Sequence, residues 1–301
     1  MDYLVWCADE FSRLYGPIDG VYFDEMILDP NDRAASGGGY DDFDGARRPT
    51  YSVQADRDLY KRIRYVLTKR NGGKPVWSIA HCSATQMMEL LSAFPVLLTG
   101  EHLYSGYFPN HPTLMPPPHD KLYYYSYSLP MHRVKYEFFH RQWGAVIAFL
   151  PCLKNQRDIM ELVEPTRDLL SRLMHADVLI WPLWCNRAEV LKTVAVRRAF
   201  DIGADDVAFV PYWENKEITS DKDTYISFYR HGKEGKSLIL VSNLARQNRE
   251  IKVKFHDPAR FGALKNAETG KEPTAVNGEL TLTIPRNDFC WIAADAPAGK
   301  R

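Results

Sequence analysis

The chain lacks an excess of charge of either sign. Its 301 residues include 38 Lys or Arg and 38 Asp or Glu, so the formal net charge is zero. Proteins that bind nucleic acids or anionic membranes attract these partners with a positive surface. The balanced charge therefore gives no support for a nucleic-acid or a membrane partner.

Long apolar runs and clustered cysteines are also missing. No apolar run is long enough to span a bilayer, and residues 1–15 lack the basic-then-apolar pattern of a signal peptide. The five cysteines are odd in number and have no CxxC spacing, which indicates neither a zinc site nor a disulfide framework. They are Cys7, Cys82, Cys152, Cys185 and Cys290. We expect neither a cofactor nor a bound metal ion.

Aromatic residues, in contrast, are plentiful. They make up 13% of the chain, with 17 Tyr and 7 Trp. Sugar-binding clefts use aromatic rings as stacking platforms, but hydrophobic cores use them too. The composition shifts the expectation only modestly toward a carbohydrate partner.

Residues 1–215 alternate between helical and strand-like patterns. Helical spacing of apolar residues predicts helices over 1–17, 56–70, 87–91, 129–142, 157–174 and 188–200. Short apolar runs predict strands over 18–25, 75–81, 96–99, 145–150 and 207–210. The state of 178–181 is ambiguous. This alternation predicts parallel βα units, and so an α/β fold.

The pattern changes after about residue 222. Short β runs follow one another over 224–230, 237–242, 250–255, 279–284 and 288–293, punctuated by turns such as Asn277-Gly278. No helical pattern intervenes. We expect an all-β antiparallel sandwich over 224–301, joined by a polar linker at 216–223 to the α/β portion at 1–215.

A long polar loop spans residues 29–50. It contains Gly37-Gly38-Gly39 and the acidic run Asp41-Asp42-Phe43-Asp44-Gly45. Loops of this length inside a compact domain are uncommon and are often functional. The acids could belong to a calcium loop, although their spacing differs from that of an EF-hand.

Polar residues stand at the ends of several expected strands. Asp24 and Glu25 close the run that begins at Ile18, and His81 and Glu101 follow the next two strands. Parallel strands in a barrel carry their chemistry at their C-terminal ends, so these side chains are expected to line one cleft. A paired-carboxylate site is the arrangement that glycoside hydrolysis uses. Alternatively, Asp24 caps the next loop and Glu25 is solvated.

The segments 19–25, 100–101 and 211–215 together resemble the barrel half of large bacterial glycoside-hydrolase-like proteins. The chain is similar in these motifs to glycoside hydrolase family 123, the β-N-acetylgalactosaminidases. The resemblance implies a (β/α)8-type barrel followed by a β-sandwich, and a periplasmic or secreted protein. A complete barrel needs ~250 residues, so this barrel is expected to be N-terminally incomplete.

The resemblance also implies roles for residues. Asp24 would orient the 2-acetamido group that acts as nucleophile, and Glu25 would be the general acid. Like-charge repulsion from Asp24 would raise the pKa of Glu25. A second variant pairs Glu25 with Glu101 as acid and nucleophile.

The remaining site residues are expected to bind the sugar. Tyr22, Tyr104 and Trp213 would offer stacking faces, with Glu214 beside Trp213, and His81 and Glu101 would hold hydroxyl groups. The expected partner is thus a carbohydrate substrate. The rival interpretations are a non-catalytic carbohydrate-binding protein and an inactive fragment of a longer glycosidase.

Overall fold

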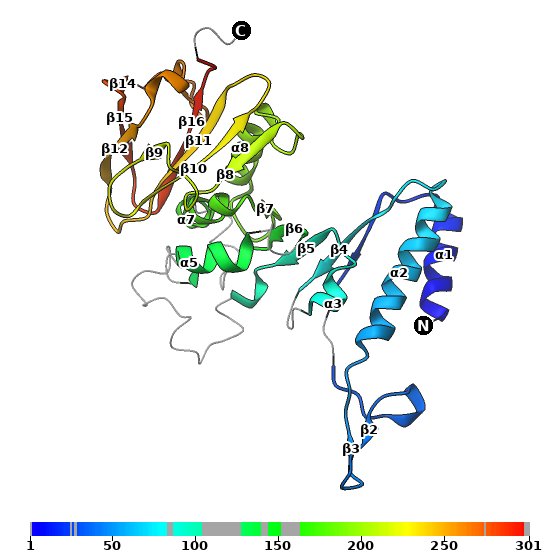
Figure 1. The fold of residues 1–301 in the computed structure, drawn as a ribbon. Coiled ribbons are helices and arrows are strands. Elements are labelled where there is room, and N and C mark those ends of the chain that lie inside the picture. The colour runs from blue at the N-terminus through cyan, green and yellow to red at the C-terminus, as the bar shows by residue number, and fades with distance from the viewer. Residues whose placement is uncertain are drawn as a thin grey trace. The chain divides into compact units, whose positions relative to one another are not determined.

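The computed structural model describes residues 2–24, 26, 29–82, 87–103, 128–139, 144–151, 163–273 and 275–297. The chain divides into two compact units, one of residues 1–102 and 140–149 and the other of 103–139 and 150–301 (Figure 1). Within the described ranges, no helix has the length and apolar character needed to cross a membrane.

The first unit contains a parallel sheet with the strand order β1–β4–β5–β6. Its strands are β1 (Gly20–Phe23), β4 (Trp77–His81), β5 (Val96–Thr99) and β6 (Val146–Phe149). All four lie in segments whose apolar runs predict strands, and their parallel pairing confirms the expected βα organisation. A closed barrel stays a prediction.

Two long helices pack beside this sheet. They are α1 (Asp2–Tyr15) and α2 (Val53–Arg70), and the short α3 (Met88–Leu91) precedes β5. Leu59, Ile63 and Leu67 recur every four residues along α2 and are buried in a cluster with Val5 of α1. Because a helix turns every 3.6 residues, this spacing places the three side chains on one face, as the sequence predicts.

Strand β1 departs from the sequence expectation of a buried strand. Its residues are half-buried or exposed, and Tyr22 is 42% exposed. The strand is exposed because it lies at the edge of the sheet, where β4 is its one neighbour in the sheet order. Val21 and Phe23 still pack against the helix cluster, so one face of the strand is covered.

The long polar loop after β1 contains a two-stranded hairpin, β2 (Tyr40–Asp41) and β3 (Arg47–Arg48). Asp41 lies 3.0 Å from Arg47, and Arg48 lies 3.3 Å from Asp42 and 2.8 Å from Asp44. Each acid of the cluster is therefore paired with an arginine of the same hairpin, which gives the calcium interpretation no support.

The second unit combines helices with antiparallel sheets. Its described helical elements include α5 (Met131–Arg133), the π-helical turn Val134–Phe138, α7 (Val163–Leu173), the 3₁₀ turn Met174–Ala176, α8 (Arg187–Ala199) and the 3₁₀ turn Pro258–Arg260. The expected helix over 129–142 is thus shorter in the structure, because Phe139 is already extended. Asn186 begins α8 by accepting a hydrogen bond from the backbone N–H of Glu189, as an N-cap residue does.

The two sheets of this unit are antiparallel. One has the order β13 (Leu264–Asn266), β16 (Asp288–Ala294), β11 (Ser237–Asn243), β10 (Thr224–His231), β8 (Val207–Val210). The other has the order β14 (Ala275–Val276), β15 (Glu279–Ile284), β12 (Arg249–Phe255), β9 (Ile218–Thr219). The five β runs predicted after residue 222 are all present.

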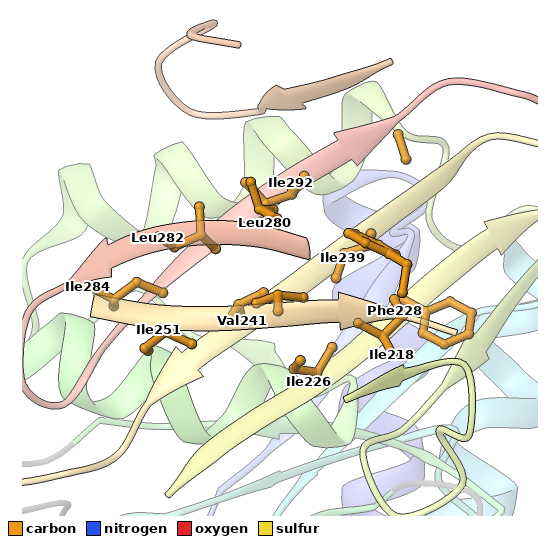
Figure 2. Close-up of a cluster of buried hydrophobic side chains, with 13 residues drawn as sticks. Ile218, Ile226, Phe228, Ile239, Val241, Ile251, Leu280, Leu282, Ile284 and Ile292 are labelled. Atoms are coloured by element: carbon orange, nitrogen blue, oxygen red, sulfur yellow. The ribbon is translucent and has the colours of Figure 1, made fainter. Parts of the chain in front are cut away.

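Side chains from both sheets form one buried core (Figure 2). Phe228 and Val241 come from the first sheet and belong to the same buried cluster as Ile251 and Val253 of the second. Along β12, buried residues alternate with exposed ones such as Glu250 and Lys252. This period of two indicates a sheet with one face in the core and one in water, as the sequence predicts.

The strand Val207–Val210 has an unexpected partner. The sequence predicts it as a strand of the parallel sheet, but it pairs antiparallel with β10, with Phe228 opposite Val210. In addition, β9 lies within the predicted linker 216–223 and pairs with β12. An apolar run of four residues predicts a strand without specifying its neighbour, which the adjacent long strand β10 supplies here.

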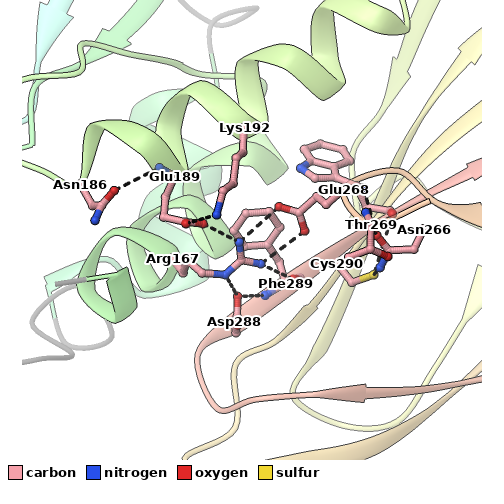
Figure 3. A network of polar contacts seen from close by, with 11 residues as sticks. Arg167, Asn186, Glu189, Lys192, Asn266, Glu268, Thr269, Asp288, Phe289 and Cys290 are labelled. Carbon is pink, nitrogen blue, oxygen red and sulfur yellow. Dashed lines mark hydrogen bonds and ion pairs between the residues drawn. The ribbon is translucent and has the colours of Figure 1, made fainter. Parts of the chain in front are cut away.

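An arginine ties the helices of the second unit to its sheet (Figure 3). Arg167 of α7 lies 2.6 Å from Asp288, 2.9 Å from Glu189 of α8 and 3.2 Å from Glu268. Burial alone would lower the pKa of Arg167, but Asp288 and Glu268 raise it above its ordinary value. The guanidinium also stacks on Phe289 at 4.3 Å, so a single side chain joins α7, α8 and β16.

Candidate functional site

Three successive strands of the parallel sheet end in polar residues at one edge. Asp24 follows β1, His81 is the last residue of β4, and Glu101 follows β5 after Gly100. Gly100 has φ 112°, a conformation that residues with a side chain rarely adopt, and it turns the chain immediately after the strand. The parallel pairing of the strands puts all three ends on the same side.

His81 lies at the centre of this group. Its Nδ1 atom is 2.7 Å from Oδ1 of Asp24 and 2.8 Å from the hydroxyl of Tyr22. The Tyr22 hydroxyl donates to the same Asp24 oxygen at 2.8 Å. When Nδ1 carries the ring proton, Asp24 accepts two hydrogen bonds and its orientation is fixed.

The opposite nitrogen of the ring faces a second carboxylate. Nε2 of His81 lies 3.0 Å from Oε2 of Glu101, which is an ion-pair distance, although the contact is not aligned as a hydrogen bond. The imidazole therefore touches carboxylates from both neighbouring strands.

The three side chains of this group differ in their exposure to solvent. The His81 side chain is 7% exposed, Glu101 is 17% exposed and Asp24 is 64% exposed. Asp24 is thus accessible to a ligand from solvent, while the ring that orients it is buried. The neighbouring Cys82 is buried, which raises the pKa of its thiol to about 12 and keeps it from acting as a thiolate nucleophile.

The other residues expected in the site are placed differently. Glu25 and Tyr104 lie outside the described residues. Trp213 and Glu214 belong to the second unit and follow β8. Trp213 packs edge-to-face on Phe139 and on Tyr212, with ring centroids 4.9 Å apart in each pair. This contact gives Trp213 a packing role within its own unit.

The bonding role of Tyr22 was not anticipated, because its expected role was sugar stacking. A signal for it was available, since residues two apart on a strand point to the same face and Tyr22 precedes Asp24 by two. Its hydroxyl reaches the carboxylate, and the ring stays half open to solvent.

Comparison with solved structures gives similarity at the level of fold. The chain superimposes on alpha-galactosidase I from Mortierella vinacea with a TM-score of 0.51, at 10% identity, over 97% of this chain and 71% of that one. It superimposes on the alpha-amylase from Geobacillus thermoleovorans, complexed with acarbose, also with a TM-score of 0.51, at 8% identity, over 97% and 63%. The fold is glycoside-hydrolase-like.

The chain aligns with only part of the length of these proteins. The maltogenic alpha-amylase AmyB from Thermotoga neapolitana aligns over 98% of this chain but 65% of its own, with a TM-score of 0.49 and 11% identity. The chain therefore spans about two thirds of the solved structures it resembles. No protein-family model and no curated protein sequence matches the chain.

Proposed function

We propose that this chain hydrolyses glycosidic bonds at the edge of the sheet where β1, β4 and β5 end. The observation that carries the proposal is the contact of one imidazole, His81, with carboxylates from both neighbouring strands, Asp24 and Glu101. Glycoside hydrolysis runs on carboxyl groups held at fixed separations around the scissile bond. The glycoside-hydrolase-like fold supports the same reaction class.

In the proposed mechanism, Glu25 protonates the leaving oxygen as general acid. Asp24 orients the 2-acetamido group of the substrate, whose carbonyl oxygen attacks the anomeric carbon. The two hydrogen bonds that Asp24 accepts from His81 and Tyr22 suit this role, because they fix its direction before substrate binds. Glu101, held beside His81, contacts a sugar hydroxyl, or in the second variant acts as nucleophile with Glu25 as acid.

Activity and binding must be measured side by side to test the proposal. The wild-type chain is assayed on a panel of 4-nitrophenyl glycosides that includes 2-acetamido sugars, and the same free sugars are titrated by calorimetry. Turnover that Glu25→Gln or Glu101→Gln abolishes supports hydrolysis at this site. Sugar binding without turnover favours the carbohydrate-binding interpretation, and neither binding nor turnover means that the proposal is wrong.

A further inference from the structure

A second cluster of metal-ligating side chains lies in the other unit, far along the chain from His81. Asp201 follows α8, His231 is the last residue of β10, and Glu234 lies in the turn that joins β10 to β11. One side-chain nitrogen or oxygen from each of the three lies within 4.8 Å of the other two. The two carboxylates are exposed, whereas His231 is buried.

The spacing within this cluster fits a bound ion better than a hydrogen bond. Nε2 of His231 lies 3.6 Å from Oε1 of Glu234, which is too long for a hydrogen bond. Two ligands on one tetrahedral zinc ion stand roughly 3.3 Å apart, given metal–ligand distances near 2.0–2.1 Å. The His231 side chain is only 7% exposed, and no described residue accepts a hydrogen bond from Nε2. Nε2 of this buried residue thus faces the carboxylates without a hydrogen-bond partner among the described residues.

Neighbouring charges hold the ligand atoms in this arrangement. Asp206 Oδ2 lies 3.2 Å from Nδ1 of His231, although the two atoms form no hydrogen bond and the backbone N–H of Glu234 donates to the same nitrogen at 3.4 Å. If a metal ion binds Nε2 and the ring proton moves to Nδ1, Asp206 is placed to be the outer carboxylate behind a metal-binding histidine. Lys236 binds the other oxygen of Glu234, Oε2, at 2.6 Å, and this leaves Oε1 turned toward the histidine. Asp201 also lines a surface cavity of about 440 Å³.

We propose that Asp201, His231 and Glu234 bind a divalent transition metal of borderline softness, represented by Zn²⁺. One imidazole and two carboxylates suit zinc, which takes three protein ligands plus water in open sites. Calcium takes six to eight oxygens, and magnesium keeps most of its water, so neither matches this donor set. The ion would join the end of α8 to the β10–β11 turn and stabilise the second unit.

The test compares wild type with two exposed-ligand variants, Asp201→Asn and Glu234→Gln. Asparagine tolerates the left-handed conformation of residue 201, which has φ 58°, so this variant is expected to fold. Asp205→Asn is the matched control, because Asp205 is exposed in the same loop and lies outside the cluster. Each protein is treated with EDTA and then titrated with ZnCl₂ or MgCl₂ by calorimetry and by thermal unfolding.

Wild type and Asp205→Asn are expected to bind Zn²⁺ and to unfold at a higher temperature with it, and to show neither effect with Mg²⁺. Asp201→Asn and Glu234→Gln should bind Zn²⁺ at least tenfold more weakly, with unchanged unfolding in EDTA. Asp206→Asn should weaken binding about 10–100-fold, as loss of an outer partner does. Equal zinc affinity in wild type and both ligand variants, an equal loss in Asp205→Asn, or no zinc binding by wild type would each overturn the proposal.

Discussion

Nδ1 of His81 lies 2.7 Å from Oδ1 of Asp24, although the two residues are 57 positions apart in the chain. They meet because β1 and β4 are adjacent parallel strands that end at the same edge. The other nitrogen of the ring approaches Glu101 after β5. Two carboxylates from neighbouring strands thus contact the same buried imidazole.

The first prediction compares the loss of the Nδ1 contact of His81 with the loss of its Nε2 contact. In His81→Asn the amide nitrogen takes the place of Nδ1 and keeps the bond to Asp24, whereas in His81→Gln it takes the place of Nε2 and keeps the contact with Glu101. If Asp24 is the residue that needs orienting, His81→Gln should lower kcat on the order of 10²-fold. His81→Asn should lower kcat less. Steady-state kinetics on one active glycoside would compare both variants.

Tyr22→Phe serves as the control for this pair. It removes the hydrogen bond from the Tyr22 hydroxyl to Asp24 and leaves the ring of His81 in place. Its effect should be smaller than that of His81→Gln. Equal activity of His81→Gln and wild type would show that Asp24 needs no orientation by the ring.

The second prediction distinguishes the roles of Glu25 and Asp24 by their dependence on the leaving group. Glu25→Gln removes the proton donor and should slow hydrolysis of substrates with poor leaving groups by ~10²–10⁴-fold. The loss should shrink for 4-nitrophenolate, which needs little protonation. Asp24→Asn should slow all 2-acetamido substrates to a similar extent. Wild-type turnover of Glu25→Gln on a poor-leaving-group substrate would remove Glu25 as the acid.

One rule of parallel sheets predicts from the sequence that Asp24, His81 and Glu101 lie close together, as they do in the structure. His81 and Glu101 follow clear apolar runs, and parallel strands bring such positions to one edge. The same rule assigned the strand before Trp213 to the parallel sheet, but residues 207–210 pair antiparallel with β10, because a run of four apolar residues has the same pattern in either kind of sheet. The pairing of Arg167 with Asp288 had no sequence signal, since 121 residues separate the two and only packing of α7 on β16 brings them together.

The third prediction concerns that arginine. Arg167→Ala leaves Asp288, Glu189 and Glu268 without their shared cation in a mostly buried site, and should lower the free energy of unfolding by about 3–5 kcal/mol. Arg167→Lys should recover only part of this loss, because an ammonium cannot reproduce the fork of a guanidinium. Urea denaturation at neutral pH measures both variants.

Arg48→Ala is the contrasting variant. Arg48 also pairs with two carboxylates, Asp42 and Asp44, but its side chain is 47% exposed. Exposed pairs contribute about 0–1 kcal/mol, so unfolding should change little. Similar losses in Arg48→Ala and Arg167→Ala would show that burial does not set the value of these pairs.

The last prediction concerns the pH dependence of stability and a buried histidine of the second unit. His175 bonds Ser227 at 2.7 Å through Nδ1 and Ser242 at 2.9 Å through Nε2. Burial, with a smaller contribution from Arg172, lowers the pKa of His175 from 6.5 to about 3. The ring therefore stays neutral in the folded chain over a range in which the unfolded chain binds a proton.

The sign of the effect follows from this difference. Above pH 6.5 the histidine is neutral in both states and adds no pH dependence. As the pH falls from 6.5 toward 3, only the unfolded state gains the proton, so this residue lowers stability by up to about 1.4 kcal/mol per pH unit. Unfolding free energies measured from pH 7 to pH 5 sample this window before most carboxylates titrate.

His175→Gln cannot take up the proton and should therefore flatten the curve between pH 7 and pH 5. The variant should also be about 1–3 kcal/mol less stable at pH 7, because glutamine does not replace both serine bonds. His256→Gln, at an exposed position, should keep the wild-type slope. Parallel curves for wild type and His175→Gln would show that His175 does not become protonated on unfolding, because a flatter curve is the direct consequence of removing a proton that only the unfolded chain binds.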